Sequence, residues 1–277
     1  MRIFSLLLVL MFVCLAGAQA SEMPLSGEAV VSSIQGRVEY TRENRRIRLR
    51  EESRIQAPGS LELSDEARLE LKLADGSVLR FSGGTECELV SAMAAGIERD
   101  VRVDVALGDC WASVKRFLGQ NSTFEVSSPT AVAGVAGTRY RVHVEQSRAS
   151  SYLVYSGKIK VGYRPVSPKY SPDQSFSGEQ EVKGPGEVSG PEEVSAPEWI
   201  MVVESGYRFD VSADGAFYRP VPFDRQEDVQ DSWVSWNMNR DEEMGFGPAA
   251  NPNDDADGFF LIPRDGSAVL DKGRKIR

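Results

Sequence analysis

The chain has 277 residues and a formal net charge of −9 at pH 7, with 41 acidic against 32 basic residues. This length accommodates one large domain or two small ones. Such an excess of acidic residues makes nucleic acid a poor candidate partner, because its phosphates carry the same sign of charge.

The first twenty residues have the pattern of a secretory signal peptide. Arg2 precedes an apolar stretch that ends in Ala18-Gln19-Ala20. This pattern predicts cleavage after Ala20 and a periplasmic or secreted bacterial protein that starts at Ser21. Arg2 is the only charge removed, so the mature chain would carry −10. No later apolar run is long enough to cross a bilayer, so we expect no transmembrane segment in the mature chain.

The chain after the signal peptide holds two cysteines, Cys87 and Cys110. Compartments outside the cytoplasm are oxidising, which favours a disulfide between these two residues. The alternative is a pair of buried thiols.

The stretch RENRRIRLR (42–50) is the one basic patch in this acidic chain. Its alternation predicts a strand with Arg46, Arg48 and Arg50 on one face. Charges on an exposed strand protect it from pairing with other edges. The functional interpretation is a surface that contacts an acidic polymer or partner.

Alternating apolar and polar residues dominate positions 27–161 and predict an all-β domain. The stretch ARLELKL (67–73) puts alanine and three leucines on one face. Arg68, Glu70 and Lys72 fall on the other face, which we expect to meet solvent as in a half-buried strand.

Register predicts the turn that follows this strand. A three-residue loop at 74–76 pairs Leu71 with Leu79, whereas a two-residue loop would pair Leu71 with Arg80 and mix the two faces. The longer loop also places Gly76 at the third loop position, where the backbone must be left-handed. We therefore predict a hairpin with a bulge.

The stretch YLVYSGKIKV (152–161) predicts a second hairpin. A two-residue loop at Ser156-Gly157 pairs Val154 with Ile159 and keeps apolar residues together on one face.

The single histidine, His143, lies in RYRVHVE (139–145) on the same face as Arg139 and Arg141. This position predicts a solvated strand residue. One histidine and two cysteines give little support to a serine–histidine–carboxylate triad or to a zinc site. We therefore predict no catalytic residues, no cofactor and no metal site.

Composition divides the chain into five parts. They are a signal peptide (1–20), a β domain (21–164), a linker or arm rich in Pro, Gly and Ser (165–197), a small β extension (198–223) and an acidic, partly disordered tail (224–277).

Two features of the tail bear on function. Trp233 and Trp236 lie three residues apart, which favours anchoring of the tail onto the β domain over a stacking platform for sugar. The stretch NDDADG (253–258) matches the first half of a calcium loop. Arg264 stands where the twelfth, bidentate ligand would be, so we do not expect calcium binding.

The stretch TAVAGVAGTRYRV (130–142) combines small residues with two glycines just before a strand. A phosphate-binding loop is not indicated, because the glycine spacing is wrong and no helix follows. The remaining interpretation is a turn at which two backbones approach closely while the chain changes layers.

This stretch resembles the signature of the FecR domain family, T-x-x-A-x-x-G-V-R-G-T-x-F-x-V. Allowing for spacing, the matching residues are Thr130, Val132, Gly134, Val135, Gly137, Thr138 and Val142. Supporting stretches are GRVEY (36–40), LKLADGSVLRF (71–81) and YLVYSGKIKV (152–161), so the resemblance covers residues 27–161. Ala136 departs from the pattern, because the family usually has arginine there.

The resemblance implies a twisted β-roll or a short solenoid-like stack of short strands, with a small C-terminal β extension and an irregular tail. Alternation alone equally allows a β-sandwich. The motif residues expected to serve the fold are Thr130, Gly134, Val135, Gly137 and Thr138.

The family resemblance also implies a domain outside the cytoplasm that contacts proteins or senses signals. Iron-uptake regulators of this family join such a domain to a membrane helix and a cytoplasmic sigma-factor-binding region. We find neither in this sequence, so that role does not carry over. We predict a non-enzymatic binding, sensing or scaffolding module whose partner is another extracytoplasmic protein. The alternative is a cell-wall or polysaccharide-binding protein that uses the arginine face and exposed aromatic residues.

Overall fold

The computed structural model describes six stretches of the chain. They are residues 27–95, 98–116, 121–135, 137–164, 199–247 and 259–261. The predicted signal peptide, the linker 165–197, the stretch 253–258 and Ala136 lie outside the described residues. The five-part division of the chain therefore stays a prediction.

Within the described residues the chain forms eighteen strands, which lie in two facing sheets joined through β9. In spatial order, sheet A contains β4 (Arg54–Gln56), β1 (Glu28–Gln35), β6 (Arg68–Leu73), β7 (Val78–Phe81), the second part of β9 (Glu98–Ser113), β12 (Arg139–Val144), β13 (Ser150–Ser156), β16 (Tyr207–Val211) and β17 (Val221–Pro222). Sheet B contains β3 (Arg45–Arg48), β2 (Val38–Arg42), β5 (Gly59–Leu63), β8 (Glu86–Ala95), the first part of β9, β10 (Asn121–Ser127), β11 (Ala131–Val135), β14 (Lys158–Tyr163), β15 (Trp199–Glu204) and β18 (Phe259–Leu261).

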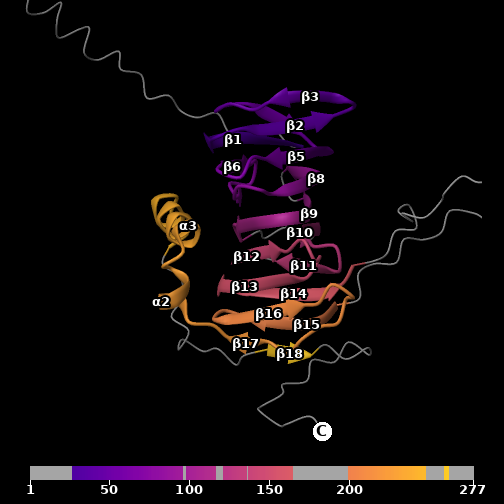
Figure 1. Ribbon diagram of the computed structural model, residues 1–277, viewed down its shortest axis with the longest axis vertical. Helices are drawn as coiled ribbons and strands as arrows, with labels where there is room; N and C mark the ends of the chain where they lie inside the picture. Colours follow the sequence, from indigo (N-terminus) through magenta and orange to yellow (C-terminus); the bar gives the residue numbers. More distant parts are fainter. Residues whose placement is uncertain are drawn as a thin grey trace, which may run out of the picture.

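The strands are piled in one direction, from β3 at one end to β17 and β18 at the other (Figure 1). Among the described strands every neighbouring pair is antiparallel except β9 and β10, which are parallel. The prediction of an all-β fold is confirmed.

The chain builds this stack by passing back and forth between the sheets. For example, β11 lies in sheet B and β12 in sheet A, while β13 lies in sheet A and β14 in sheet B. Each sheet turns its apolar side inward, so one continuous core fills the space between them. Buried core side chains from both sheets include Val31, Leu71, Phe81, Val103, Tyr140 and Ile159.

The hairpin predicted at residues 74–76 is confirmed. Leu71 lies opposite Leu79, and Gly76 has φ +79°. Because both strands stay in sheet A, the alternating pattern and the turn geometry agree on one register.

The hairpin predicted at Ser156-Gly157 is wrong. β13 and β14 do not pair with each other, because the chain crosses from sheet A to sheet B at this point. Val154 and Ile159 are both buried in the core, as the prediction required, but they enter it from opposite sheets.

This crossing requires glycine at position 157. The backbone there is left-handed, with φ +79°, which side chains of L-residues rarely adopt. A Cβ atom would also lie 2.8 Å from the carbonyl oxygen of Gly137 and 3.0 Å from Oγ1 of Thr138. Both the dihedral angle and the space therefore exclude a side chain.

We expect Gly157→Ala to lower the free energy of unfolding by about 3 kcal/mol, because a strained dihedral and a backbone clash add together. Gly215→Ala is the matched control. Gly215 also has a left-handed φ, of +86°, but a Cβ there would meet nothing within 4 Å. It should cost only about 1 kcal/mol. Urea melts of both variants measure the difference, and equal costs would contradict the predicted clash.

Two helices follow the last long strands. They are α2 (Arg225–Asp228) and α3 (Ser232–Glu243). Asp231 caps α3 by accepting a hydrogen bond from the backbone N–H of Trp233 at 2.8 Å. Both helices lie beside the stack (Figure 1). Neither is long and apolar enough to be a candidate membrane span.

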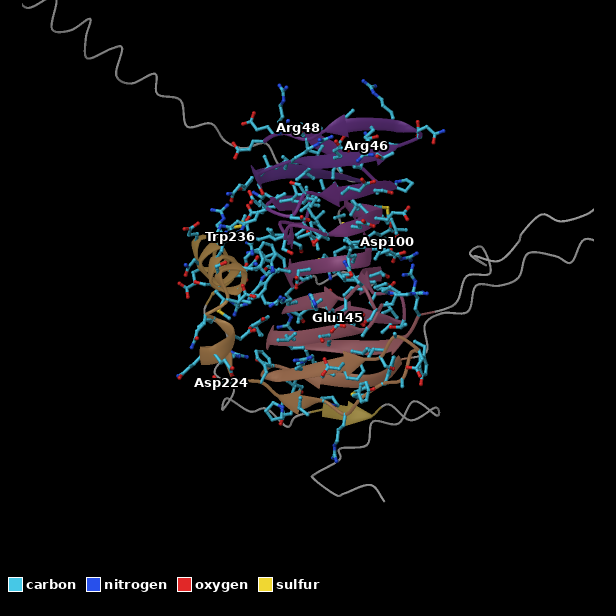
Figure 2. The ribbon with its side chains drawn as sticks, in the orientation of Figure 1. Arg46, Arg48, Asp100, Glu145, Asp224 and Trp236 are labelled. Carbon is cyan, nitrogen blue, oxygen red and sulfur yellow. The ribbon has the colours of Figure 1, made fainter. Side chains whose placement is uncertain are left out.

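α3 lies against the outer side of sheet A. Trp233 and Val234 are buried and pack with Trp111, Leu153 and Tyr155 from the sheet. The tryptophan pair of the tail thus anchors α3 onto the β domain, as predicted. Trp236 stacks on Trp233, with 5.4 Å between the ring centroids, and is partly buried against the same cluster. Figure 2 labels Trp236 beside α3.

Candidate interaction surfaces

A buried cluster of charges fixes α3 to sheet A. Arg80 on β7 donates from Nε to Glu70 of β6 at 2.7 Å and from Nη1 to Asp241 of α3 at 2.6 Å. All three side chains have no exposed surface. The prediction that Glu70 meets solvent is wrong, because α3 covers the polar side of β6.

The remaining oxygens of this cluster are also satisfied. Asp241 accepts hydrogen bonds from Trp111 Nε1 at 3.1 Å and from Ser113 Oγ at 2.6 Å. Arg240 Nη2 donates to Glu70 Oε1 at 2.9 Å. Two arginines and two carboxylates therefore neutralise each other beneath the helix. Removing one member would leave a buried charge without its counter-ion.

The cluster lowers the pKa of Glu70. Burial by itself would raise it, but the hydrogen bonds from Arg240 and Arg80 outweigh that cost. A carboxylate with a lowered folded-state pKa stabilises the fold above its unfolded pKa of about 4.3. That contribution is lost as the pH falls through the folded-state value.

We expect Asp241→Asn to destabilise the docked helix by about 3–5 kcal/mol, because Arg80 keeps only one of its two carboxylates. The matched control is Glu243→Gln, which removes an exposed carboxylate of the same helix and should cost less than about 0.5 kcal/mol. Urea melts followed by tryptophan fluorescence report on Trp111 and Trp233 at the interface. An Asp241→Asn melt that coincides with the parent would show that the cluster does not hold the helix.

The glycine-containing motif lies at the corner between β11 and β12. Gly134 is a strand residue, paired with Glu125 on one side and Lys160 on the other. Gly137 has φ +71°, and a Cβ there would lie 3.2 Å from Cβ of Arg116.

The other motif residues contact their own chain. Thr138 is buried and donates from Oγ1 to the carbonyl of Lys158 at 2.8 Å. Val135 of β11 lies opposite Ile159 of β14. The Oγ1 atom of Thr130, just before β11, is buried without a hydrogen-bond partner among the described residues. These contacts agree with a role in the fold, which stays a prediction for the five motif residues.

The predicted disulfide is not formed, and Cys87 and Cys110 are free, buried thiols. Cys87 lies on β8 in sheet B, whereas Cys110 lies on the part of β9 that belongs to sheet A. Facing sheets pack about 10 Å apart, whereas bridged cysteines have Cα atoms roughly 4.4–6.8 Å apart. Burial raises the pKa of both thiols, which keeps them protonated and unreactive.

His143 is half-exposed on the outer face of sheet A, where the sequence predicts a solvated strand residue. Its Nδ1 lies 3.1 Å from Oδ2 of Asp109, whose other oxygen accepts from Arg141 Nε at 2.6 Å. The hydrogen bond with Asp109 raises the pKa of His143, against a smaller opposing effect of burial.

A raised folded-state pKa means that protonated His143 stabilises the fold below its unfolded pKa of about 6.5. This contribution is lost as the pH rises through the folded-state value. We therefore expect the difference in unfolding free energy between the parent and His143→Gln to shrink between pH 6 and alkaline pH. Since the chain has one histidine, an NMR titration of untagged protein assigns the pKa directly. A value at or below the ordinary one would contradict the Asp109 contact.

β3 forms one end of sheet B and carries the predicted arginine face. A two-residue turn at Glu43-Asn44 joins it to β2, with φ of 49° and 63° at the two positions. All four residues of β3 are exposed. Figure 2 labels Arg46 and Arg48 at this end of the stack.

The arginines at this end are only partly neutralised. Arg46 pairs with Glu39 of β2 and, at 2.7 Å, with Glu62 of β5. The side chains of Arg45, Arg48 and Arg50 make no hydrogen bond or ion pair with the described part of the chain. Residues 37–56 hold seven arginines and four glutamates, a net charge of +3 in a chain that carries −9 overall.

Metal-ligating residues do not gather in the described part of the chain. No group of three or more His, Cys, Asp or Glu side chains there could hold a metal ion.

The fold defines the chain as a two-sheet, all-β protein in which strands of both sheets stack in one direction. Residues 59–160 match the family described as "FecR protein". The match runs from the start of β5 into β14 and includes the motif at 130–138. The arginine strand β3 precedes it.

No curated protein matches the chain. Two crystal structures of "a putative anti-sigma factor" from Parabacteroides distasonis are similar at 15% sequence identity and a TM-score of 0.41. Each similarity covers 67% of this chain, and 73% and 74% of the two solved chains.

Proposed function

We propose that this protein is an extracytoplasmic, non-enzymatic module that binds, senses or scaffolds through contacts with another protein of the cell envelope. The match to the FecR family supports a regulatory domain that works by protein contact. The pattern of residues 1–20 supports secretion with cleavage after Ala20.

The observation that carries the proposal is the arginine-rich end of the stack. Exposed arginines without counter-ions attract carboxylates and raise the rate of encounter with an acidic partner. Arg45 and Arg48 lie on an exposed strand in an otherwise acidic chain, so this end differs in sign from the rest of the molecule.

A cell-wall polysaccharide is the second candidate partner. Tyr163 and Tyr218 are 50% and 56% exposed and offer aromatic faces of the kind on which sugars stack. Tyr163 is already stacked on Phe217, with ring centroids 4.5 Å apart.

Site-specific photocrosslinking in intact cells tests the proposal. A photoreactive amino acid replaces Ser60, an exposed residue of β5 close to the arginine end, or Lys160, an exposed residue of β14 in the middle of the stack. We expect a discrete protein adduct from position 60 and a much weaker one from position 160. Sedimentation of the protein with purified cell wall, without any protein adduct, would favour the polysaccharide instead. A mature protein found in the cytoplasm would overturn the proposal.

A further inference from the structure

We propose that the free edge of β3 binds an extended segment of the partner by strand addition, and that this segment alternates acidic and apolar residues. The inference rests on the proposed function and specifies how the partner is held. In this mode, backbone hydrogen bonds give affinity and alternate side chains give specificity.

The backbone of β3 has the free groups that strand addition needs. The backbone N–H of Leu49 donates to the carbonyl of Val38 at 3.0 Å, so these two residues form a hydrogen-bonded pair of the β2–β3 hairpin. Such pairs alternate along the hairpin, so Tyr40 and Ile47 form the next one. In an antiparallel pair the residues between such positions point their N–H and C=O groups away from the partner strand. Arg46 and Arg48 are the residues of β3 whose backbone groups point away from β2. Figure 1 shows no strand next to β3 on that edge.

The free edge is short and has a defined end. Beyond Arg48, the next outward-pointing N–H belongs to Arg50, and it donates to Oγ of Ser53 at 3.0 Å. The carbonyl of Arg50 accepts from the N–H of Ser53 at 3.1 Å. The available edge is therefore β3 itself, which limits an added strand to a few residues.

Two other described edges, β17 and β4, are less suited to an added strand. β17, the last strand of sheet A, has two residues, and one of them is Pro222, which has no N–H to donate. β4, at the same end of the stack as β3, has three residues. Its Gln56 carbonyl already accepts a hydrogen bond from the hydroxyl of Tyr40.

The two faces of β3 specify the side chains of the added strand. Arg46 and Arg48 share one face, because side chains alternate along a strand. Ile47 lies on the other face, directly opposite the buried Tyr40, and remains 38% exposed at the end of the core. A partner strand with carboxylates on the first face and apolar side chains on the second would pair the arginines and cover Ile47.

The cations at this end suit carboxylates in particular. Every positive residue in 37–56 is an arginine and none is a lysine. A guanidinium group binds a carboxylate through two parallel hydrogen bonds, whereas an ammonium group acts as a point charge. The alternative role of these charges is to keep β3 from pairing with any strand. Protection of that kind gives no preference for an acidic peptide.

Binding of a synthetic peptide separates the two roles. The probe is an acetylated octapeptide of alternating glutamate and valine with a fluorescent label, titrated into the full-length secreted protein. We expect saturable binding that weakens as salt is added. An otherwise identical peptide with lysine in place of glutamate should not bind. Absence of binding by the acidic peptide, or equal binding by the lysine peptide, would overturn the proposal.

Two N-methylated versions of the acidic peptide test for backbone pairing. Amides of successive residues in a strand point to opposite edges. Methylation of either all the glutamate nitrogens or all the valine nitrogens therefore blocks one edge only. One version should lose binding and the other should keep it. Binding of both versions as tightly as the parent peptide would mean simple charge attraction and would overturn strand addition.

Matched charge variants locate the binding site. The double variant R48Q/R50Q removes two arginines of the charged face whose side chains make no hydrogen bond or ion pair with the described part of the chain, and it should weaken peptide binding by about tenfold. The double variant K158Q/K160Q removes the same charge from exposed positions on β14 and should bind as the parent does. Equal weakening by both variants would place binding elsewhere. Thermal melts by circular dichroism verify that each variant is folded.

Photocrosslinking and peptide binding together distinguish a failure of strand addition from a failure of the proposed function. If the photocrosslinked adduct at position 60 forms equally well with R48Q/R50Q, protein contact stands and strand addition to β3 is wrong. If no adduct forms with the parent protein while the peptide binds, β3 accepts acidic strands but the proposed cellular role is wrong.

Discussion

The fold depends on the ability of the chain to change sheets within a few residues. At each of six crossings a glycine takes up a left-handed φ: Gly36, Gly84, Gly108, Gly137, Gly157 and Gly206. At position 157 the need goes beyond the dihedral angle, because the neighbouring corner at Gly137 fills the space that a side chain would occupy. Tight corners of this kind let successive strands enter the core from opposite sides. They also let the stack lengthen one strand at a time without long loops.

Alternation in the sequence predicts which side chains face the core, but it does not say which sheet supplies them. The turn at 74–76 could be predicted because both strands belong to sheet A, so that register and turn type constrain each other. At Ser156-Gly157 the same apolar pattern fits two arrangements. Val154 and Ile159 face the core whether β14 returns beside β13 or crosses to the opposite sheet. Only the contacts of each strand with distant strands distinguish the two.

Local pattern also misses whatever comes to lie on the polar side of a strand. Glu70 alternates with leucines and is predicted to meet solvent, yet α3, from a segment some 160 residues later, buries it completely. The tryptophans of α3 were the available signal that this segment docks. The acidic and basic partners beneath them, Asp241 and Arg80, could not be paired from sequence. The cysteines illustrate a similar limit, because an oxidising compartment permits a disulfide but the two facing sheets keep Cys87 and Cys110 apart.

The surroundings of the arginines separate the structural charges from those open to a partner. Arg80 is enclosed with Glu70 and Asp241, so its charge is satisfied within the molecule and serves the attachment of α3. The arginines of β3 lie at an end of the stack where pairing is incomplete both for the backbone and for the side chains. At the opposite end, sheet A closes with the two-residue strand that contains Pro222. The edge of sheet B at β3 can therefore accept a further strand, and an acidic strand bound there would extend the stack by one strand.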